Sequence, residues 1–306
     1  MTRSTAPLGH VQEIGNGVHA FVQPDGGWFL NNVGIVVGAD LVVLIDTAAT
    51  ERRTRALLAV VDELAPGRPR IAVTTHFHGD HTLGNAFLDR ETRIVAHAGT
   101  RALMAETGLS VTEMWPEVEW GAVRVRLPDV EITDFAAVHT GSHRIELRHL
   151  GVSHTAHDLV AWLPDDGVLF AGDQVMSGCT PFLLFGSVLG AREAMTTLQE
   201  LRPRVVVPGH GAVADAGIID DNITYLEWIL DLAARAMRNG HNPVRAVRDA
   251  GPGPFPHWID PERHVANVHR ALADLWGVPG GTPLDLAEVM ADVAAACPGG
   301  RLRCRA

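Results

Sequence analysis

The sequence predicts a layered α/β fold that continues into a helical C-terminal extension. Each of two consecutive halves, which together reach residue 207, begins with strand patterns and continues with strands that alternate with helices. Strands interleaved with helices in this way place the sheets inside and the helices outside. Short continuous apolar runs, such as 41–45 and 204–207, are typical of strands buried on both faces.

The composition indicates a well-buried globular protein and excludes some classes of partner. Of the 306 residues, 46% are hydrophobic and only 20% are charged, which argues against disorder. The net charge of −11 offers no basic face for nucleic acid or for an anionic membrane surface. The N-terminus lacks the apolar segment of a secretory signal, and no stretch has membrane-spanning length, so we expect a cytoplasmic protein. The three cysteines are odd in number and widely spaced, which argues against a disulfide framework.

The first strands lie before residue 46 and lead into a helix. They are predicted at Val18–Val22, Trp28–Gly38 and Asp40–Ile45. A proline and two glycines at 24–27 indicate a hairpin-type turn between the first two. A helix over 49–64 follows, because apolar residues recur there at helical spacing and Pro66-Gly67 ends the pattern.

The rest of the first 215 residues repeats the alternation of strands and helices. Strands are predicted over 71–73, 92–96, 123–127, 144–150, 159–163, 168–171 and 204–207. Helices are predicted near 80–89, 98–107 and 190–201. Residues 108–121 are predicted to form a loop that carries Trp115. We see no residue-level repeat between the two halves, although their shared order is compatible with a duplication.

The pattern changes after residue 216, where glycine and proline separate four helical segments. These helices are predicted over 218–238, 243–249, 261–276 and 284–296. Because no linker-like low complexity precedes them, we predict a core over residues 1–215 and an extension over residues 216–306 that packs on it. The extension carries Trp228, Trp258 and Trp276, and could cap the core or form the surface of a homodimer.

A dense cluster of metal-ligand residues follows the strand at 71–73. His76, His78, Asp80 and His81 fall within six residues, and Gly79 lets the backbone turn between them. Three imidazoles and a carboxylate suit borderline divalent metals, zinc above all. Although the chain contains 16 histidines, chance should produce this pattern in only roughly a few chains per thousand.

Three later residues occupy equivalent positions in the sequence pattern, each at the end of an apolar strand or in the turn after it. They are His154, Asp173 and His210. Sites in α/β folds are built at strand ends. A single histidine or aspartate at such a place is more often structural, but together with the cluster at 76–81 these residues suffice for two adjacent metals.

These residues belong to motifs that resemble the metallo-β-lactamase fold superfamily. The motifs are His-x-His-x-Asp-His at 76–81, Gly-x-x-His-Thr at 151–155, Ala-Gly-Asp at 171–173 and Pro-Gly-His-Gly at 208–211. Their order and spacing match that family over residues 10–215. The resemblance implies a four-layer αβ/βα sandwich with the metals at one edge of the paired sheets.

The resemblance also implies a ligand set for two Zn²⁺ per chain, with iron or manganese as alternatives. It assigns His76, His78 and His154 to the first metal, Asp80, His81 and His210 to the second, and Asp173 to both. Asp46 matches an acid that would orient a ligand imidazole from behind. The alternative for Asp46 is an ordinary turn or helix-capping aspartate.

Two metals about 3.5–4 Å apart could hold a hydroxide and polarise a carbonyl, so that no serine or cysteine nucleophile is needed. Asp80 would act as the catalytic proton shuttle beside them. Cys179 is then expected to be a packed apolar residue. Lactamases that bind their second metal through cysteine carry it where this chain has Asp173. We therefore expect cleavage of esters, lactones or thioesters more than of β-lactams.

Aromatic residues near the metal-ligand motifs predict an apolar substrate pocket. They are Trp28, Phe29, Trp115, Phe182 and Phe185. The segments 28–32, 50–55 and 168–190 resemble a branch that includes aromatic polyketide cyclases and thioesterases. That resemblance implies a small-molecule substrate, which a carrier protein could present as a thioester. His157-Asp158 departs from the Thr-Asn expected in those cyclases.

The leading hypothesis is therefore a zinc-dependent enzyme that acts on a carbonyl of an aromatic polyketide-like substrate. A second hypothesis keeps the metals and assigns general hydrolysis by a lactonase, a glyoxalase-type thioesterase or a weak β-lactamase. A third is iron-based oxidation, which the identity of the metal would decide. A fourth is a non-catalytic binding protein, which the complete ligand set disfavours.

Overall fold

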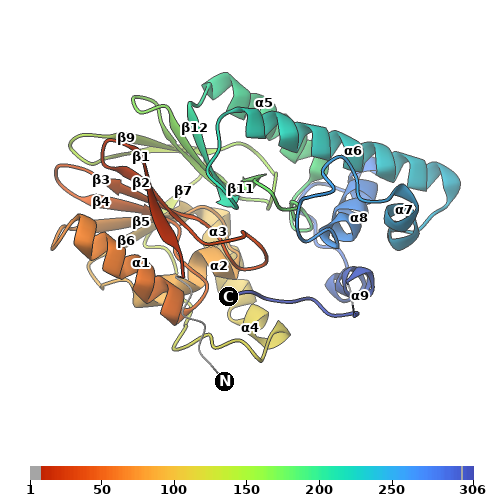
Figure 1. Cartoon of the computed structure of the whole chain (residues 1–306), viewed down its shortest axis with the longest axis horizontal. Coiled ribbons are helices and arrows are strands. Elements are labelled where there is room, and N and C mark those ends of the chain that lie inside the picture. The colour runs from red at the N-terminus through yellow and green to blue at the C-terminus, as the bar shows by residue number, and fades with distance from the viewer. Residues whose placement is uncertain (1–7, 298) are drawn as a thin grey trace.

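The computed structural model describes residues 8–297 and 299–306, and within them two β-sheets lie between layers of helices (Figure 1). This arrangement confirms the predicted αβ/βα sandwich with additional C-terminal helices. The first sheet has the spatial order β1 (His10–Gly15), β2 (Val18–Val22), β3 (Val33–Val37), β4 (Val42–Ile45), β5 (Arg70–Thr74), β6 (Arg93–His97) and β7 (Val130–Ile132). The second has the order β12 (Val205–His210), β11 (Val168–Met176), β10 (Leu159–Leu163), β9 (Arg144–His149) and β8 (Phe135–His139).

Both sheets change from antiparallel to parallel pairing, and this brings strand ends together. In the first sheet, the pairs from β1 to β4 are antiparallel and those from β4 to β7 are parallel. In the second, β11 and β12 are parallel. Ile45 of β4 lies opposite Val73 of β5, so the residues that follow these two strands emerge side by side at one edge. Carboxyl ends of parallel strands are where α/β proteins build their sites.

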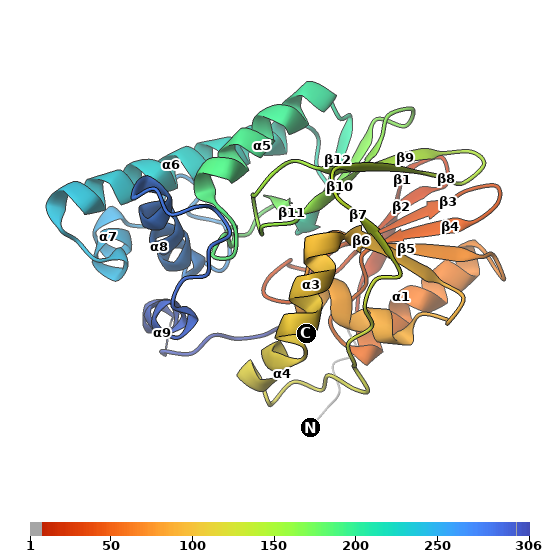
Figure 2. The same cartoon turned by 180° about the vertical axis from the view of Figure 1, so that it is seen from behind.

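Helices cover the outer faces of both sheets. Those in the first 215 residues are α1 (Glu51–Leu64), α2 (Gly79–Thr82), the 3₁₀-helix η1 (Leu83–Phe87), α3 (Ala98–Thr107), α4 (Ser110–Met114) and α5 (Val188–Leu201). Figure 2 shows α1 and α3 on the side of the first sheet and α5 on the side of the second. Helix α1 begins at the cap residue Thr50, whose side chain accepts a hydrogen bond from the Arg53 amide.

The space between the sheets is a continuous apolar core. Val18, Val43 and Val73 of the first sheet pack with Leu147 and Phe170 of the second, and all five are buried. At about 25 cal/mol per Å² of apolar surface removed from water, such contacts are the main source of stability. This core holds the two sheets in a fixed relation, which in turn fixes the edge where their strands end.

The extension consists of α6 (Gly217–Asn239), α7 (Pro243–Ala250), α8 (Arg263–Leu275) and α9 (Leu286–Ala296). Apolar residues of α6 and α8 form one buried cluster with α5 and the outer face of the second sheet. Residues 299–306 then run back from α9 toward α4 (Figure 2). Trp258 is buried in this region, whereas Trp276 is 66% exposed. None of the helices in the described ranges is long and apolar enough to cross a membrane.

The strand predicted over Trp28–Gly38 was wrong for its first five residues, which form a loop. Phe29 has φ +69°, which does not fit a strand. The Asn32 side chain donates to the carbonyls of Pro208 and Gly211, at 2.9 and 2.8 Å. The loop is thus attached to the end of β12 and does not extend the β2–β3 ladder, whose pairing begins at Val33.

The strand predicted over Val123–Leu127 was also wrong, because the segment is irregular. The Arg126 guanidinium donates to the main-chain carbonyls of Leu88, Asp89 and Thr92, at 2.7 to 3.0 Å. A side chain therefore holds this segment in the place of a backbone ladder. The strands of this region are β7 and β8, which the sequence analysis did not identify.

Two predictions near the site, one of a helix and one of a loop, need smaller corrections. The helix expected near 80–89 is a single α-turn followed by the 3₁₀-helix η1. Gly84 is pressed against Ala48 and Thr54, and Asn85 donates to Thr74 Oγ1 at 3.2 Å, which pulls the chain into the tighter form. The loop expected over 108–121 contains the short helix α4, and Trp115 follows its last residue.

Candidate metal centre

The predicted ligands come from different elements that end at one edge of the sandwich. His76 and His78 follow β5, and His154 lies in the loop before β10. Asp173 is on β11, and His210 is the last residue of β12. Asp80 and His81 lie on α2, which begins directly after the turn. The structure thus brings together all seven residues that the sequence singled out, in two groups.

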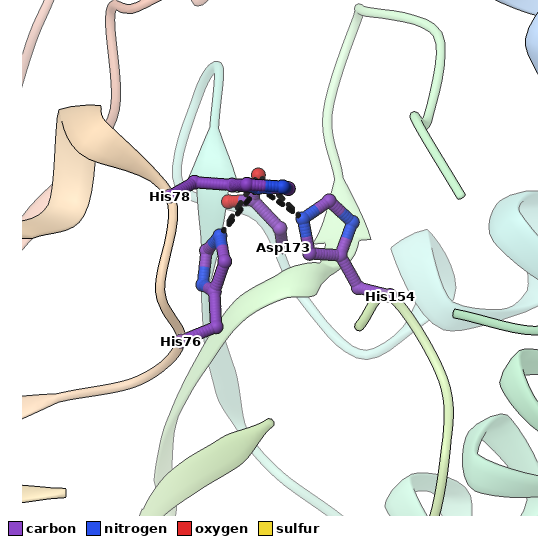
Figure 3. Close-up of side chains that lie close together, drawn as sticks. All are labelled: His76, His78, His154 and Asp173. Carbon is purple, nitrogen blue, oxygen red and sulfur yellow. Dashed lines mark hydrogen bonds and ion pairs between the residues drawn. The ribbon is translucent and has the colours of Figure 1, made fainter. Parts of the chain in front are cut away.

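The first ligand group consists of His76, His78 and His154, with Asp173 beside it (Figure 3). His78 Nδ1 lies 3.1 Å from His76 Nε2 and 2.9 Å from His154 Nε2. Asp173 Oδ2 lies 3.8 Å from His76 Nε2 and 3.5 Å from His154 Nε2. Three imidazole nitrogens and a carboxylate oxygen therefore point at one small volume.

The second ligand group consists of Asp80, His81 and His210. Asp80 Oδ2 lies 3.1 Å from His210 Nε2 and 3.7 Å from His81 Nε2. Asp173 reaches this group as well, since its Oδ1 is 3.1 Å from His81 Nε2 and its Oδ2 is 3.5 Å from His210 Nε2. Asp173 consequently lies between the two groups, where a bridging ligand would be.

Hydrogen bonds behind the imidazoles assign their tautomers. His81 Nδ1 donates to Asp46 Oδ2 at 2.8 Å, and His210 Nδ1 donates to the Gly26 carbonyl at 3.1 Å. His76 Nδ1 lies 3.0 Å from Thr75 Oγ1. With the proton on Nδ1, each ring turns the lone pair of Nε2 toward the carboxylates. The role of Asp46 as an orienting group thus has the geometry it needs, and Thr50, not Asp46, caps α1.

This arrangement of acceptors fits a pair of cations. The lone pairs of the neutral imidazoles face carboxylate oxygens, which would repel each other without positive charge between them. His81 Nε2 and Asp173 Oδ1 are buried without a hydrogen-bond partner, a costly state that a coordinated ion would relieve. Nitrogen and carboxylate donors in this mixture suit zinc, and also iron or manganese.

The electrostatics separate the two groups. Burial lowers the pKa of His78 to about 4 and that of His154 to about 3, which keeps both rings neutral, as ligation requires. Burial also opposes charge on His210, but the carboxylates of Asp173 and Asp80 outweigh it and raise the pKa of His210 to about 9. The second group thus attracts positive charge strongly, whether as a proton or as a metal ion.

Local backbone features make this geometry available. Asp46 has φ +70°, a strained conformation for a residue with a side chain, and its carboxylate also accepts from the Thr75 amide at 2.7 Å. A Cβ on Gly209 would lie 1.9 Å from Asp173 Oδ1, so only glycine lets β12 pass so close to that carboxylate. The Pro-Gly-His-Gly motif therefore serves Asp173 as well as His210.

An apolar cavity of about 290 Å³ opens over the metal centre. His78, Asp80, His154, Asp173 and His210 lie at its base. The five predicted pocket residues all line it, namely Trp28, Phe29, Trp115, Phe182 and Phe185. Their rings pack edge to face, with the centroids of Trp28 and Phe182 5.0 Å apart. The cavity thus combines a polar base with aromatic walls, as small-molecule sites do.

Other parts of this environment were missed by the sequence analysis. Arg263, Leu286 and Met290 of the extension also line the cavity. Asp158 supports the loop of His154, because it accepts from Ser153 Oγ at 2.8 Å and from the Thr155 amide at 2.7 Å. The helical pattern predicted the elements that carry the first three residues, but nothing in it indicated that they face the cavity. Cys179 is buried, and burial raises the pKa of its thiol to about 12, as expected of a packed residue.

The fold and the metal centre define a class of protein that sequence comparison also identifies. The model of the metallo-beta-lactamase superfamily matches residues 26–210, more than half of the chain. The chain therefore belongs to the metallo-β-lactamase superfamily. The matched range contains all seven proposed ligands, from His76 to His210.

Individual relatives are distant. The chain is 29% identical over 184 residues to the metallo-beta-lactamase type 2 of Bacillus cereus, a match that covers 58% of this chain and 65% of that protein. It is also 29% identical over 205 residues to the human acyl-coenzyme A thioesterase MBLAC2, covering 58% of this chain and 72% of that one.

Among solved structures, a metallo-beta-lactamase from Pontibacter korlensis superposes with a TM-score of 0.61 and 24% sequence identity. That match covers 98% of the Pontibacter chain but 71% of this one. At this identity it establishes the fold alone.

Proposed function

We propose that this protein is a dinuclear zinc-dependent hydrolase that cleaves thioesters or esters of a large apolar acyl group. One observation carries the proposal. The Asp173 carboxylate lies between two histidine groups at the base of an aromatic cavity, within 3.8 Å of a nitrogen from each group. Such a site would hold two ions below a bound acyl group.

When bound, two divalent ions would polarise the substrate carbonyl and lower the pKa of water toward about 7. The protein's own side chains would bind the substrate and transfer the proton. The aromatic walls would exclude water and orient the acyl group, so that its carbonyl lies over the base of the cavity. Asp80 lines the cavity and turns Oδ2 toward His210, which leaves Oδ1 to take a proton from water and pass it to the leaving thiolate.

Two further observations support a thioester over a β-lactam. Asp173 stands where lactamases with a cysteine ligand carry that cysteine, and one of the curated relatives is a thioesterase. The walls are apolar and aromatic, which suits an acyl chain or ring system. The second candidate is β-lactam hydrolysis, which the Bacillus cereus relative favours.

The finer proposal is that the acyl group is an aromatic polyketide thioester, and that its cyclisation occurs in the same cavity. An enolate and a tetrahedral oxyanion need the same electrostatic stabilisation, so one site could serve ring closure and release. Mass spectrometry of the products separates the two outcomes. A linear acid indicates hydrolysis alone, whereas loss of water together with thiol release indicates cyclisation.

The test uses zinc-loaded protein with its metal content measured by elemental analysis. The substrates are the 2-naphthoyl thioester of N-acetylcysteamine, a simple lactone and a chromogenic cephalosporin. We expect two metal ions per chain and the highest kcat/KM for the thioester. Protein that binds no metal, or that prefers the cephalosporin, would refute the proposal. Iron in place of zinc would favour the alternative hypothesis of oxidation with dioxygen.

Asp80→Asn provides the matched variant, since it is isosteric and replaces the carboxylate that would accept the proton. We expect thioester hydrolysis to fall by about 10²- to 10⁴-fold while circular dichroism stays unchanged. The metal content of the variant is measured in parallel, because Asp80 is also a proposed ligand. A fully metallated variant that keeps its turnover would remove Asp80 from the proton transfer.

A further inference from the structure

Trp28 lines the cavity and belongs to residues 1–215, yet the groups that hold it in place belong to the C-terminal extension. Its amide donates to Asp260 Oδ2 at 3.1 Å, and its indole Nε1 donates to Glu262 Oε1 at 2.7 Å. The Arg263 guanidinium lies 4.1 Å from the centroid of its ring, a cation–π contact. The Trp28 carbonyl accepts from the Arg305 amide at 3.0 Å. The position of this wall therefore depends on residues more than 230 positions later in the chain.

The neighbouring part of the wall, which contains Phe182 and Phe185, depends on the same helix. Phe182 and Phe185 lie in the pocket loop, residues 180–187, and α8 bonds to the backbone of that loop. Arg263 donates to the Thr180 carbonyl at 2.9 Å. Asn267 donates to the Pro181 carbonyl at 2.7 Å and accepts from the Leu183 amide at 2.8 Å.

A third residue of α8 fixes the far end of the pocket loop. Asp274 Oδ2 accepts from Ser187 Oγ at 3.0 Å and from the Val188 amide at 2.7 Å, so it supports the N-terminus of α5, whose N-cap residue is Ser187. Arg270 Nε holds the other oxygen of Asp274 at 3.0 Å. Spacings of four, three and four along 263, 267, 270 and 274 place these four side chains on one face of the helix.

Helix α9 completes the enclosure with apolar side chains. Leu286 and Met290 line the cavity, and Leu286 is 45% exposed, which places it at the mouth. Methionine and leucine are adaptable neighbours for a flat ring. The extension thus holds two walls through α8 and supplies part of a third through α9, whereas the proposed ligands all precede residue 211.

We infer that α8 and α9 determine which acyl group the enzyme accepts, and that Arg263, Asn267 and Glu262 are positioning residues for an aromatic acyl group. The inference rests on the proposed function in placing the acyl group in this cavity. Trp28 and Phe182 meet edge to face 5.0 Å apart, so a flat ring system can add a further aromatic contact to this pair. A small acyl group such as acetyl would not reach these walls and would not depend on them.

Glu262→Ala tests the inference most cleanly. Glu262 is half-buried, and its carboxylate holds the indole nitrogen of Trp28 without contacting the metal centre. Glu262→Gln keeps an acceptor for that nitrogen and is the conservative rescue. Glu288→Ala on α9 is the matched control, because it removes the same charge from an exposed neighbouring site.

Two readouts are measured on zinc-loaded proteins. The first is kcat/KM for the 2-naphthoyl and the acetyl thioesters of N-acetylcysteamine. We expect Glu262→Ala to lower the naphthoyl-to-acetyl ratio by about three- to tenfold, mainly through KM, since one hydrogen bond to a half-buried, solvent-screened carboxylate is lost. Glu262→Gln should restore most of the ratio, and Glu288→Ala should leave it unchanged.

The second readout is the binding of 2-naphthoate, followed by quenching of tryptophan fluorescence, which does not require turnover. We expect the same three- to tenfold weakening in Glu262→Ala. If naphthoate binding weakens but neither thioester is hydrolysed, the inference stands and the proposed function fails. If both thioesters are hydrolysed but the ratio and the binding are unchanged, the inference fails and the proposed function stands. Wild-type protein that binds no naphthoate also overturns the inference.

Discussion

Asp46→Asn tests the proposed metal centre by changing one oxygen to an amide nitrogen. The Asp46 carboxylate accepts three hydrogen bonds, from the Thr75 amide, from Thr75 Oγ1 and from His81 Nδ1, at 2.7 to 2.8 Å. An asparagine that keeps its oxygen toward the Thr75 amide must place its NH₂ beside His81 Nδ1. His81 Nδ1 must then accept a hydrogen bond from that NH₂, so the proton of the ring moves to Nε2. This removes the lone pair that a metal needs.

The same substitution reaches the first ligand group through Thr75. Its hydroxyl donates to Asp46 and accepts from His76 Nδ1, at 2.8 and 3.0 Å. Facing an amide NH₂, the hydroxyl must turn its proton toward His76, which moves the proton of that ring to Nε2 as well. Loss of such an orienting partner weakens metal binding by about 10- to 100-fold. This factor corresponds to about 1.4–2.8 kcal/mol at each site.

The assay is competitive titration of Zn²⁺ with a chromophoric chelator, which resolves the affinities of the two sites. Thr75→Val should weaken only the site that contains His76, because it leaves the bond between Asp46 and His81 in place. Asp274→Asn is the matched control, since its side chain is as buried as that of Asp46 and has no contact with the ligands. Two unchanged zinc affinities in Asp46→Asn would refute this account of the site.

Three further predictions concern stability. Removing the metals with a chelator should lower Tm, because carboxylates and imidazole lone pairs then face each other. Added Zn²⁺ should restore Tm, whereas Ca²⁺, which prefers oxygen ligands, should not. Asp274→Ala leaves Arg270 buried without its carboxylate, so calorimetry should show a loss of about 3–5 kcal/mol, and a loss below about 1 kcal/mol would contradict this. Burial lowers the pKa of His264 from 6.5 to about 4, so stability should fall as pH drops through this range. His264→Gln should flatten that slope in chemical denaturation, and an unchanged slope would exclude His264 as its source.

The sequence predicted the ligands well because their chemistry is local. The cluster at 76–81 follows one strand, His154 lies in the connection before another and His210 ends a third, so strand patterns bring these residues to the same edge. Asp173 was expected just after a strand that ends at 171, but β11 continues through it to Met176. The partners behind the imidazoles were harder to predict. Asp46 could be proposed from the family resemblance, whereas the Gly26 carbonyl that accepts from His210 carries no side-chain signal at all.

Irregular segments were predicted least well, for a physical reason. Residues 28–32 and 123–127 have strand-like composition, but side chains from distant segments determine their backbone paths. The four helices of the extension were predicted, since each carries its own apolar period. That Arg263 and Asn267 turn a polar face toward the cavity walls depends on tertiary packing, which a helical period does not encode.

The anchoring of Trp28 by residues 260–305 has a consequence for biosynthesis. The chain grows from its N-terminus, so every proposed metal ligand is made before the helix that positions this tryptophan. A nascent chain that ends at His210 carries the complete ligand set but none of the groups that bond to Trp28. Contacts of such long sequence separation form late and slowly in folding. The aromatic wall can therefore be completed only after residues 260–305 have been made, later than the ligands beneath it.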